Sequence, residues 1–187
     1  QTQRAAHCRH SSNTIRESPL TIEMVMKALL IHIPKSGGSS LRQSPELRRK
    51  VRVPNRMDMI NSEYVRELKA EMGEIEGPLP YGHARLRDIR LASRLGRRTF
   101  ALVRNPFARV VSRYSMAKKV WGRPALPLRE ERREFRDFLM TREKDVNVPF
   151  NWHRAIRSWS PAVDYLTDNR GEVVADVLRF ECMTQDI

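Results

Sequence analysis

The chain has 187 residues, and its 35 Lys and Arg against 22 Asp and Glu give a formal net charge of +13. This length suits one domain with a real core, and the 40% apolar content lies above the range of disordered chains. The excess of cations predicts an anionic partner without identifying it. The longest apolar run covers residues 28–31, whereas a membrane-spanning helix needs about 20 such residues, so no transmembrane segment is expected.

The first 25 residues form a polar stretch without the apolar segment of a secretory signal. We expect a disordered tail there, either an upstream extension or the edge of a fragment, and one domain over residues 26–187. The two cysteines, Cys8 and Cys182, predict neither a disulfide framework nor a metal cluster. The sequence therefore predicts a reducing, cytoplasmic location.

The first half of the domain begins with a strand expected over residues 27–33, apolar on both faces as in a parallel sheet. A glycine-rich turn follows and leads into a helix near Ser39. The pair Ser44 and Pro45 predicts that a helix restarts there, because serine caps helices and proline fits the first helical position. Apolar spacing predicts an amphipathic helix over residues 61–72 and a short helix over residues 89–95.

The second half repeats the order of strand, turn and helix. Residues 99–103 form an apolar strand, and a helix is expected after Pro106 as far as about Val120. A charge-rich helix over residues 128–142, a helix around 152–159 and a third strand over 173–180 complete the pattern. Strands alternating with helices predict an α/β fold with a mainly parallel central sheet.

The turn after the first strand has the chemistry of a phosphate or sulfate cradle. Residues 34–40 read Pro-Lys-Ser-Gly-Gly-Ser-Ser, which brings one cation, free backbone amides and hydroxyls to the carboxyl end of a strand. The nucleotide-triphosphate loop is excluded, because its lysine follows the second glycine and Lys35 precedes both. For two glycines alone, a simple tight turn is the alternative reading.

The turn after the second strand offers a second anion-binding position. Arg104 stands at the strand end, and Ser112 lies two turns into the helix that follows. These two side chains could close on a second phosphate. For Arg109 and Arg113 the alternative is a solvated helix face.

Together, residues 31–41 (IHIPKSGGSSL) and 103–114 (VRNPFARVVSRY) resemble the sulfotransferase family that uses 3′-phosphoadenosine-5′-phosphosulfate (PAPS). The first segment is most similar to the carbohydrate branch that includes heparan sulfate 2-O- and 6-O-sulfotransferases. Residues 177–181 (VLRFE) resemble a late strand of that family. The resemblance covers residues 26–187 and implies a P-loop-like, three-layer α/β fold, from which the C-terminal part of the family's domain would be missing here.

The resemblance also implies roles for individual residues. Lys35 would contact the 5′-phosphosulfate and stabilise the leaving phosphate, and His83 would be the general base, since its ordinary pKa of about 6.5 suits that task. For a lone histidine such as His83 a structural role is the alternative, and His32 is expected to be structural. The remaining implied cofactor ligands are Ser36, Gly37, Gly38, Ser39 and Ser40 for the 5′-phosphate, and Arg104 and Ser112 for the 3′-phosphate.

The expected function is in-line transfer of a sulfuryl group from PAPS to a hydroxyl or amine of a carbohydrate-like acceptor. The basic charge would suit an anionic acceptor, while nucleic acid is not expected as a partner and no metal is expected. Two alternatives remain open, namely a nucleotide-dependent kinase or NTPase of related fold and a non-catalytic polyanion-binding module. The two motifs specify neither the acceptor nor the oligomeric state, because variable loops form the pocket walls.

Overall fold

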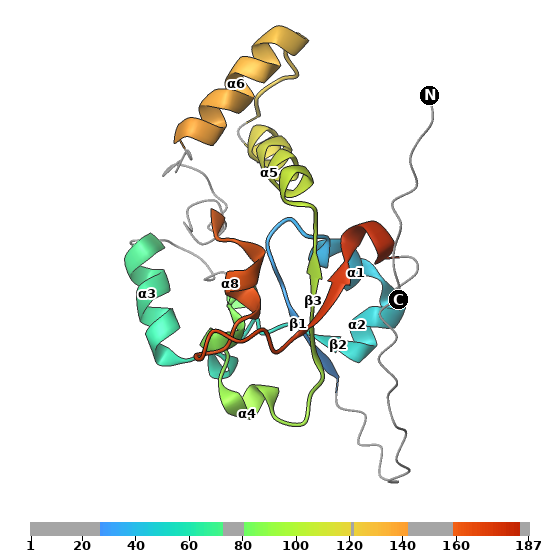
Figure 1. Cartoon of the computed structure of the whole chain (residues 1–187), viewed down its shortest axis with the longest axis vertical. Coiled ribbons are helices and arrows are strands. Elements are labelled where there is room, and N and C mark those ends of the chain that lie inside the picture. The colour runs from blue at the N-terminus through green and yellow to red at the C-terminus, as the bar shows by residue number, and fades with distance from the viewer. Residues whose placement is uncertain (1–26, 73–80, 121, 142–158, 184–187) are drawn as a thin grey trace.

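The computed structural model describes residues 27–72, 81–120, 122–141 and 159–183 (Figure 1). The tail expected over residues 1–25 and the helix expected from residue 152 lie outside these ranges. No helix of the described residues is both long and apolar enough to cross a membrane.

One sheet of four parallel strands forms the centre of the fold, in the order β2-β1-β3-β4. The register pairs Ile31 with Ala101 and Val103 with Arg179. The expected α/β fold with a parallel sheet is therefore confirmed, whereas β2 was not predicted because two residues are too few to show a period. The strands are β1 (Ala28–Ile31), β2 (Val51–Arg52), β3 (Thr99–Val103) and β4 (Asp176–Arg179).

The helices follow the expected order along the chain. Ser44 has an extended backbone and Pro45 takes the first helical position, so the predicted restart of the helix is confirmed. A short helix after residue 160 was not predicted, because five residues show too little periodicity. The helices are α1 (Gly38–Gln43), α2 (Pro45–Lys50), α3 (Ser62–Met72), α4 (Leu91–Arg94), α5 (Pro106–Val120), α6 (Leu128–Thr141) and α8 (Ala162–Leu166).

Helices cover both faces of the sheet. In a strand, alternate side chains point to opposite faces, and β1 places Leu29 and Ile31 in one apolar cluster with residues of α3 and α8. Leu30 belongs to a second cluster with Leu41 of α1 and Leu102 of β3. Figure 1 shows α3 and α8 on one side of the sheet and α1 and α2 on the other. The fold thus has three layers.

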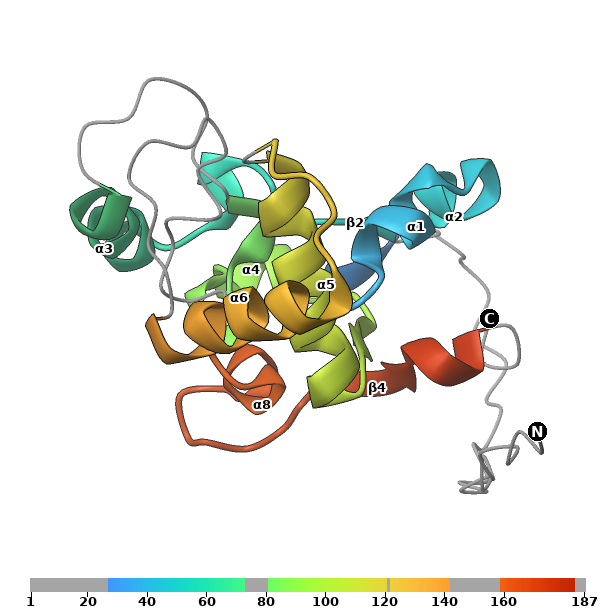
Figure 2. The ribbon, with the colours of Figure 1, turned by 90° about the horizontal axis from the view of Figure 1, so that it is seen from above.

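A third apolar cluster joins α5 and α6, which lie across one another when seen from above (Figure 2). Tyr114 and Ala117 of α5 pack with Phe138 of α6, and the partly buried Trp159 packs against this cluster. The ring centroids of Phe138 and Trp159 are 5.3 Å apart. This packing fixes α5, the helix that carries Ser112.

Near the end of the described chain, the buried Cys182 lies in a short 3₁₀ turn, Phe180–Cys182. Cys182 is disulfide-bonded. A disulfide was not expected from the sequence.

Candidate functional site

A cavity of about 250 Å³ lies at the edge of the sheet where β1 and β3 end. Its walls come from the turn after β1 and the start of α1, the turn after β3, the middle of α5, the turn after β4 and one residue between α3 and α4. The structure brings together nearly all residues that the two sequence motifs singled out. Those that line this cavity are Lys35, Gly37, Gly38, Ser39, Ser40, His83, Arg104 and Ser112.

The turn after β1 has an unusual backbone. Lys35 has φ of 64° and Gly37 has φ of 92°, both in the left-handed region. For a lysine this conformation costs about 1–2 kcal/mol, and such strain concentrates at functional sites. The turn therefore gives up stability to present Lys35 to the cavity.

Ser36 departs from the predicted set of cofactor ligands. Its amide donates to the carbonyl of Ile33 at 3.3 Å, and its buried hydroxyl has no hydrogen-bond partner in the described part of the chain. Ser36 is absent from the cavity wall, whereas Ser39 and Ser40 are exposed and line it. The structure therefore does not place Ser36 where the sequence predicted.

The two glycines of the turn make room for two rings. A Cβ atom on Gly37 would lie 2.3 Å from Cδ2 of Phe180, and one on Gly38 would lie 2.2 Å from Cδ2 of His32. Both rings line the cavity. The Gly-Gly pair thus serves side-chain packing as well as the freedom of the turn, a purpose that the sequence alone did not reveal.

Positive charge gathers around Lys35, which is half-buried. Burial lowers the pKa of the Lys35 ammonium, and the nearby Arg104 and Arg113 lower it further. An anion bound in the cavity would counter all three effects, because an opposite charge at close range favours the charged form of a lysine. The electrostatics of this turn therefore favour an anionic ligand.

His83 is held in one tautomer. Its Nδ1 lies 3.0 Å from the carbonyl oxygen of His32, which can only accept, so Nδ1 carries the proton and Nε2 of the neutral ring is an acceptor. Burial lowers the pKa of His83, the hydrogen bond to His32 opposes that shift, and Arg42 adds to it. A 3₁₀ turn, Tyr81–His83, positions the ring.

His32 also lines the cavity, which the sequence did not predict. Its ring is 7% exposed, and its centroid lies 4.4 Å from that of His83. Burial, followed by His83, Arg42 and Lys35, lowers the pKa of His32 to about 3. Its position directly after β1, at the edge where ligands bind, was the one available signal.

The turn after β4 supports the strand end that carries Arg104. The Arg104 guanidinium lies 4.7 Å from the centroid of the Phe180 ring, within the range of a cation–π contact. The carboxylate of Glu181 accepts a hydrogen bond from the Asn105 amide at 2.8 Å. Segments that are far apart in sequence therefore fix Arg104 at the cavity.

Two further arginines of α5 point into the structure. Arg109 donates to the carbonyls of Pro34 and Ser160, both at 3.0 Å, and so ties α5 to the turn after β1. Arg113 is 4% exposed, and its guanidinium lies 4.2 Å from the centroid of the Trp159 ring. Burial lowers the pKa of Arg113 to about 10, and Arg109 adds to the shift. The alternative of a solvated helix face is therefore wrong for Arg113.

Among the described residues, no group of three His, Cys, Asp or Glu side chains could hold a metal ion. No protein-family model, curated protein or solved structure matches the chain. The function is therefore inferred from the residues and geometry of this cavity.

Proposed function

We propose that the chain is a sulfotransferase that moves a sulfuryl group from PAPS to a hydroxyl or amine of a carbohydrate-like acceptor. One observation carries the proposal: Lys35, Arg104, Ser112 and His83, from two motifs and a separate turn, all line one cavity. A purely structural turn would give no reason for a strained lysine, an arginine and two histidines to line the same cavity.

The donor set fits a ligand with two anionic ends. Lys35 and the hydroxyls of Ser39 and Ser40 lie at one strand end, and Arg104 and Ser112 lie at the next. Ligand pockets usually enclose about 300 to 1,000 Å³. At about 250 Å³ the cavity is smaller than this range, so it would enclose only part of the donor.

PAPS supplies the sulfuryl group and a phosphate leaving group. The Lys35 ammonium stabilises the negative charge that develops on the departing phosphate oxygen. Nε2 of His83 takes the proton of the attacking hydroxyl, because Nδ1 is already committed to the His32 carbonyl. Arg104 and Ser112 hold the 3′-phosphate and thereby position the donor.

The acceptor is proposed from the same chemistry. The net charge of +13 suits an anionic glycan, since a basic surface concentrates polyanions near the cavity. The identity of the sugar depends on loops outside the two motifs.

The test uses 3′-phosphoadenosine-5′-phosphate and radiolabelled PAPS with the whole chain. The nucleotide should raise the melting temperature, and label should pass from PAPS to a carbohydrate acceptor. Lys35→Ala should abolish transfer, while His83→Ala should lower the rate by about 10² to 10⁴-fold and keep nucleotide binding.

Three other results would contradict the proposal. Full transfer activity in Lys35→Ala would remove its central element. Magnesium-dependent ATP hydrolysis would favour a kinase or NTPase. Salt-sensitive heparin binding that ignores the nucleotide would favour a polyanion-binding module.

A further inference from the structure

His32 is a buried polar side chain whose polar atoms are not used by the fold. The residue is 7% exposed and lines the cavity. Its ring nitrogens make no hydrogen bond within the described part of the chain, and neither is among the fully buried atoms that lack a partner, so they face the cavity. The neighbouring His83 instead commits its Nδ1 to the His32 carbonyl. The ring nitrogens of His32 are therefore open to a bound ligand.

The backbone makes specific room for this ring. A Cβ atom on Gly38 would lie 2.2 Å from Cδ2 and 2.6 Å from Nε2 of His32, closer than real Cβ atoms come. Nε2 therefore lies against the turn that also presents Lys35. This position places a ring nitrogen of His32 in the cavity that Lys35 and His83 also line.

The surroundings keep the ring neutral. The titratable groups that face it are His83, Arg42 and Lys35, and all of them disfavour a second positive charge. A neutral imidazole has one N–H donor and one acceptor nitrogen. His32 can therefore donate one hydrogen bond without carrying charge into an already positive cavity.

We propose that His32 is a second catalytic residue, which binds the acceptor hydroxyl together with His83. This proposal rests on the proposed sulfuryl transfer. A hydroxyl has one proton and two lone pairs. His83 Nε2 accepts the proton, the N–H of His32 donates to one lone pair, and the second lone pair remains directed at sulfur.

In the transfer step the acceptor oxygen forms a bond to sulfur, and the bond from sulfur to the 5′-phosphate oxygen breaks. The bonding electrons leave with the phosphate, and the hydroxyl proton moves to His83. His32 exchanges no proton with the solvent in this step, because its part is to orient the acceptor. Two adjacent imidazoles, with centroids 4.4 Å apart, thus divide binding and proton transfer between them.

The test compares wild type with His32→Phe, which keeps the ring and removes both nitrogens, and with His32→Asn, which restores a donor. Transfer from radiolabelled PAPS to desulfated heparin and to p-nitrophenyl glycosides is measured as kcat and KM for the acceptor. The KM should rise about tenfold in His32→Phe, as the loss of one hydrogen bond implies, and recover in part in His32→Asn. Affinity for 3′-phosphoadenosine-5′-phosphate should stay within about twofold in both variants, which also shows that they fold.

A second variant displaces the His32 ring by a change at the adjacent Gly38. Gly38→Ala should displace His32 and raise the acceptor KM in the same way. In the double variant with His32→Asn, the alanine should add little, because the crowding ring is gone.

The outcomes separate the two proposals. If wild type transfers sulfate and His32→Phe keeps the wild-type KM for the acceptor, the role of His32 is overturned and the proposed function stands. A loss of nucleotide affinity in His32→Phe would also overturn it, because the ring would then serve the donor side. If wild type neither binds the nucleotide nor transfers sulfate, the proposed function fails, and the role of His32 fails with it.

Discussion

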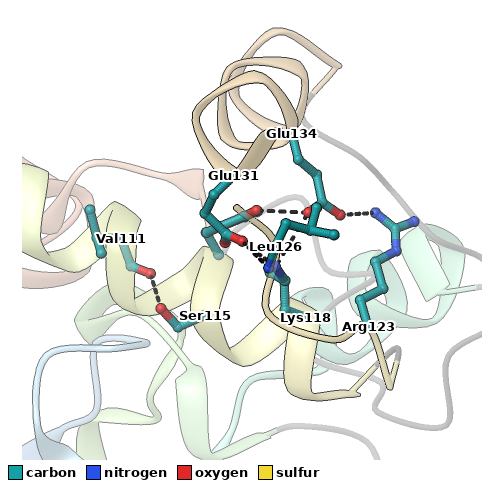
Figure 3. Close-up of polar contacts among 8 residues, drawn as sticks. Val111, Ser115, Lys118, Arg123, Leu126, Glu131 and Glu134 are labelled. Atoms are coloured by element: carbon teal, nitrogen blue, oxygen red, sulfur yellow. Dashed lines mark hydrogen bonds and ion pairs between the residues drawn. The ribbon is translucent and has the colours of Figure 1, made fainter. Parts of the chain in front are cut away.

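Two lysines in this fold stand in opposite electrostatic surroundings. Lys118 of α5 is 8% exposed, and its Nζ lies 2.6 Å from Glu131 and 3.4 Å from Glu134 of α6 (Figure 3). Its hydrogen bond to Glu131 raises the pKa of the Lys118 ammonium. At the turn after β1, burial and two arginines instead lower the pKa of Lys35.

The difference separates a structural charge cluster from a binding site. Between α5 and α6, the carboxylates of Glu131 and Glu134 form ion pairs with Lys118. Glu134 also accepts hydrogen bonds from Arg123 at 2.9 Å and from Tyr114 at 3.0 Å. Around Lys35, burial and the neighbouring Arg104 and Arg113 instead lower the pKa of the ammonium, an effect that an anionic ligand in the cavity would oppose. The two regions should therefore respond independently to substitution.

The largest effect is expected at Gly37, where the cavity depends on space rather than charge. In Gly37→Ala the new Cβ would meet the Phe180 ring at 2.3 Å, on a backbone with φ of 92°. Strain and crowding together should lower the free energy of unfolding by about 2–5 kcal/mol. Urea unfolding followed by circular dichroism measures the loss.

A matched glycine isolates the crowding. Gly171 also has a positive φ, of 83°, but nothing lies within 4 Å of its missing Cβ. Gly171→Ala should therefore cost only about 1 kcal/mol. Equal losses in the two variants would show that Phe180 does not pack on the turn, and removal of the ring by Phe180→Ala should rescue part of the loss in Gly37→Ala.

The second effect is a difference between the two lysines in what their loss changes, nucleotide affinity for Lys35 and stability for Lys118. Lys35→Met should weaken binding of 3′-phosphoadenosine-5′-phosphate about tenfold to a hundredfold, as the loss of a charged hydrogen bond implies, with little change in stability. Lys118→Met should lower the free energy of unfolding, because Glu131 loses its cation, and keep the nucleotide affinity. Calorimetric titration and urea unfolding of both variants measure the two quantities.

The opposite pattern would contradict the assignment of Lys35 to the binding site and of Lys118 to a structural cluster. If Lys118→Met lost nucleotide binding while Lys35→Met lost stability, the α5–α6 cluster would belong to the site.

Much of this arrangement could be predicted from the sequence, because local patterns carry it. The apolar runs predicted β1 and β3, and Pro45 predicted the start of α2. The convergence of the turns at Lys35 and Arg104 followed from one rule, that the ends of neighbouring parallel strands share an edge.

The rest depends on contacts that no local pattern records. Arg113 is charged and lies on a helix, which predicts a solvated face, yet Trp159 covers it from a distant segment. The His32 ring fits beside the turn because residue 38 is glycine, where a Cβ atom would lie 2.2 Å from the ring. Ser36 sits within the motif, but the direction of its side chain depends on the left-handed residues on either side.

The third effect is a pH dependence that belongs to the cavity alone. In the unfolded chain His32 takes up a proton below pH 6.5, whereas in the folded chain its pKa is about 3. The unfolded state thus binds more protons in this window, so stability falls as the pH drops from about 6.5, by up to about 1.4 kcal/mol per pH unit. Burial also lowers the pKa of His83, which adds to the slope in this window. His32→Asn should therefore reduce the slope in urea unfolding between pH 6.5 and 5 and leave the part that His83 contributes.

The α5–α6 cluster responds in a different window. Its hydrogen bond to Lys118 lowers the pKa of Glu131 from 4.5, so the stability that Glu131 contributes is present above pH 4.5 and is lost as the pH falls further. Equal slopes in wild type and His32→Asn between pH 6.5 and 5 would show that His32 is not held neutral.

The smallest effect tests one hydrogen bond of the α5–α6 cluster. The Tyr114 hydroxyl donates to Glu134 at 3.0 Å. Burial, followed by hydrogen bonding to Glu131 and Glu134, raises the pKa of Tyr114. Tyr114→Phe keeps the ring against Phe138 and leaves Glu134 with Arg123, so the loss should be about 1 kcal/mol in urea unfolding. The control is Ser115→Ala on the exposed side of α5, where the hydroxyl only bonds the Val111 carbonyl of its own helix (Figure 3), and the change should stay within about 0.5 kcal/mol. Nucleotide affinity should be unchanged in both variants, because the charges of this cluster are balanced within it; weaker binding in Tyr114→Phe would mean that α6 helps to position Ser112 at the cavity.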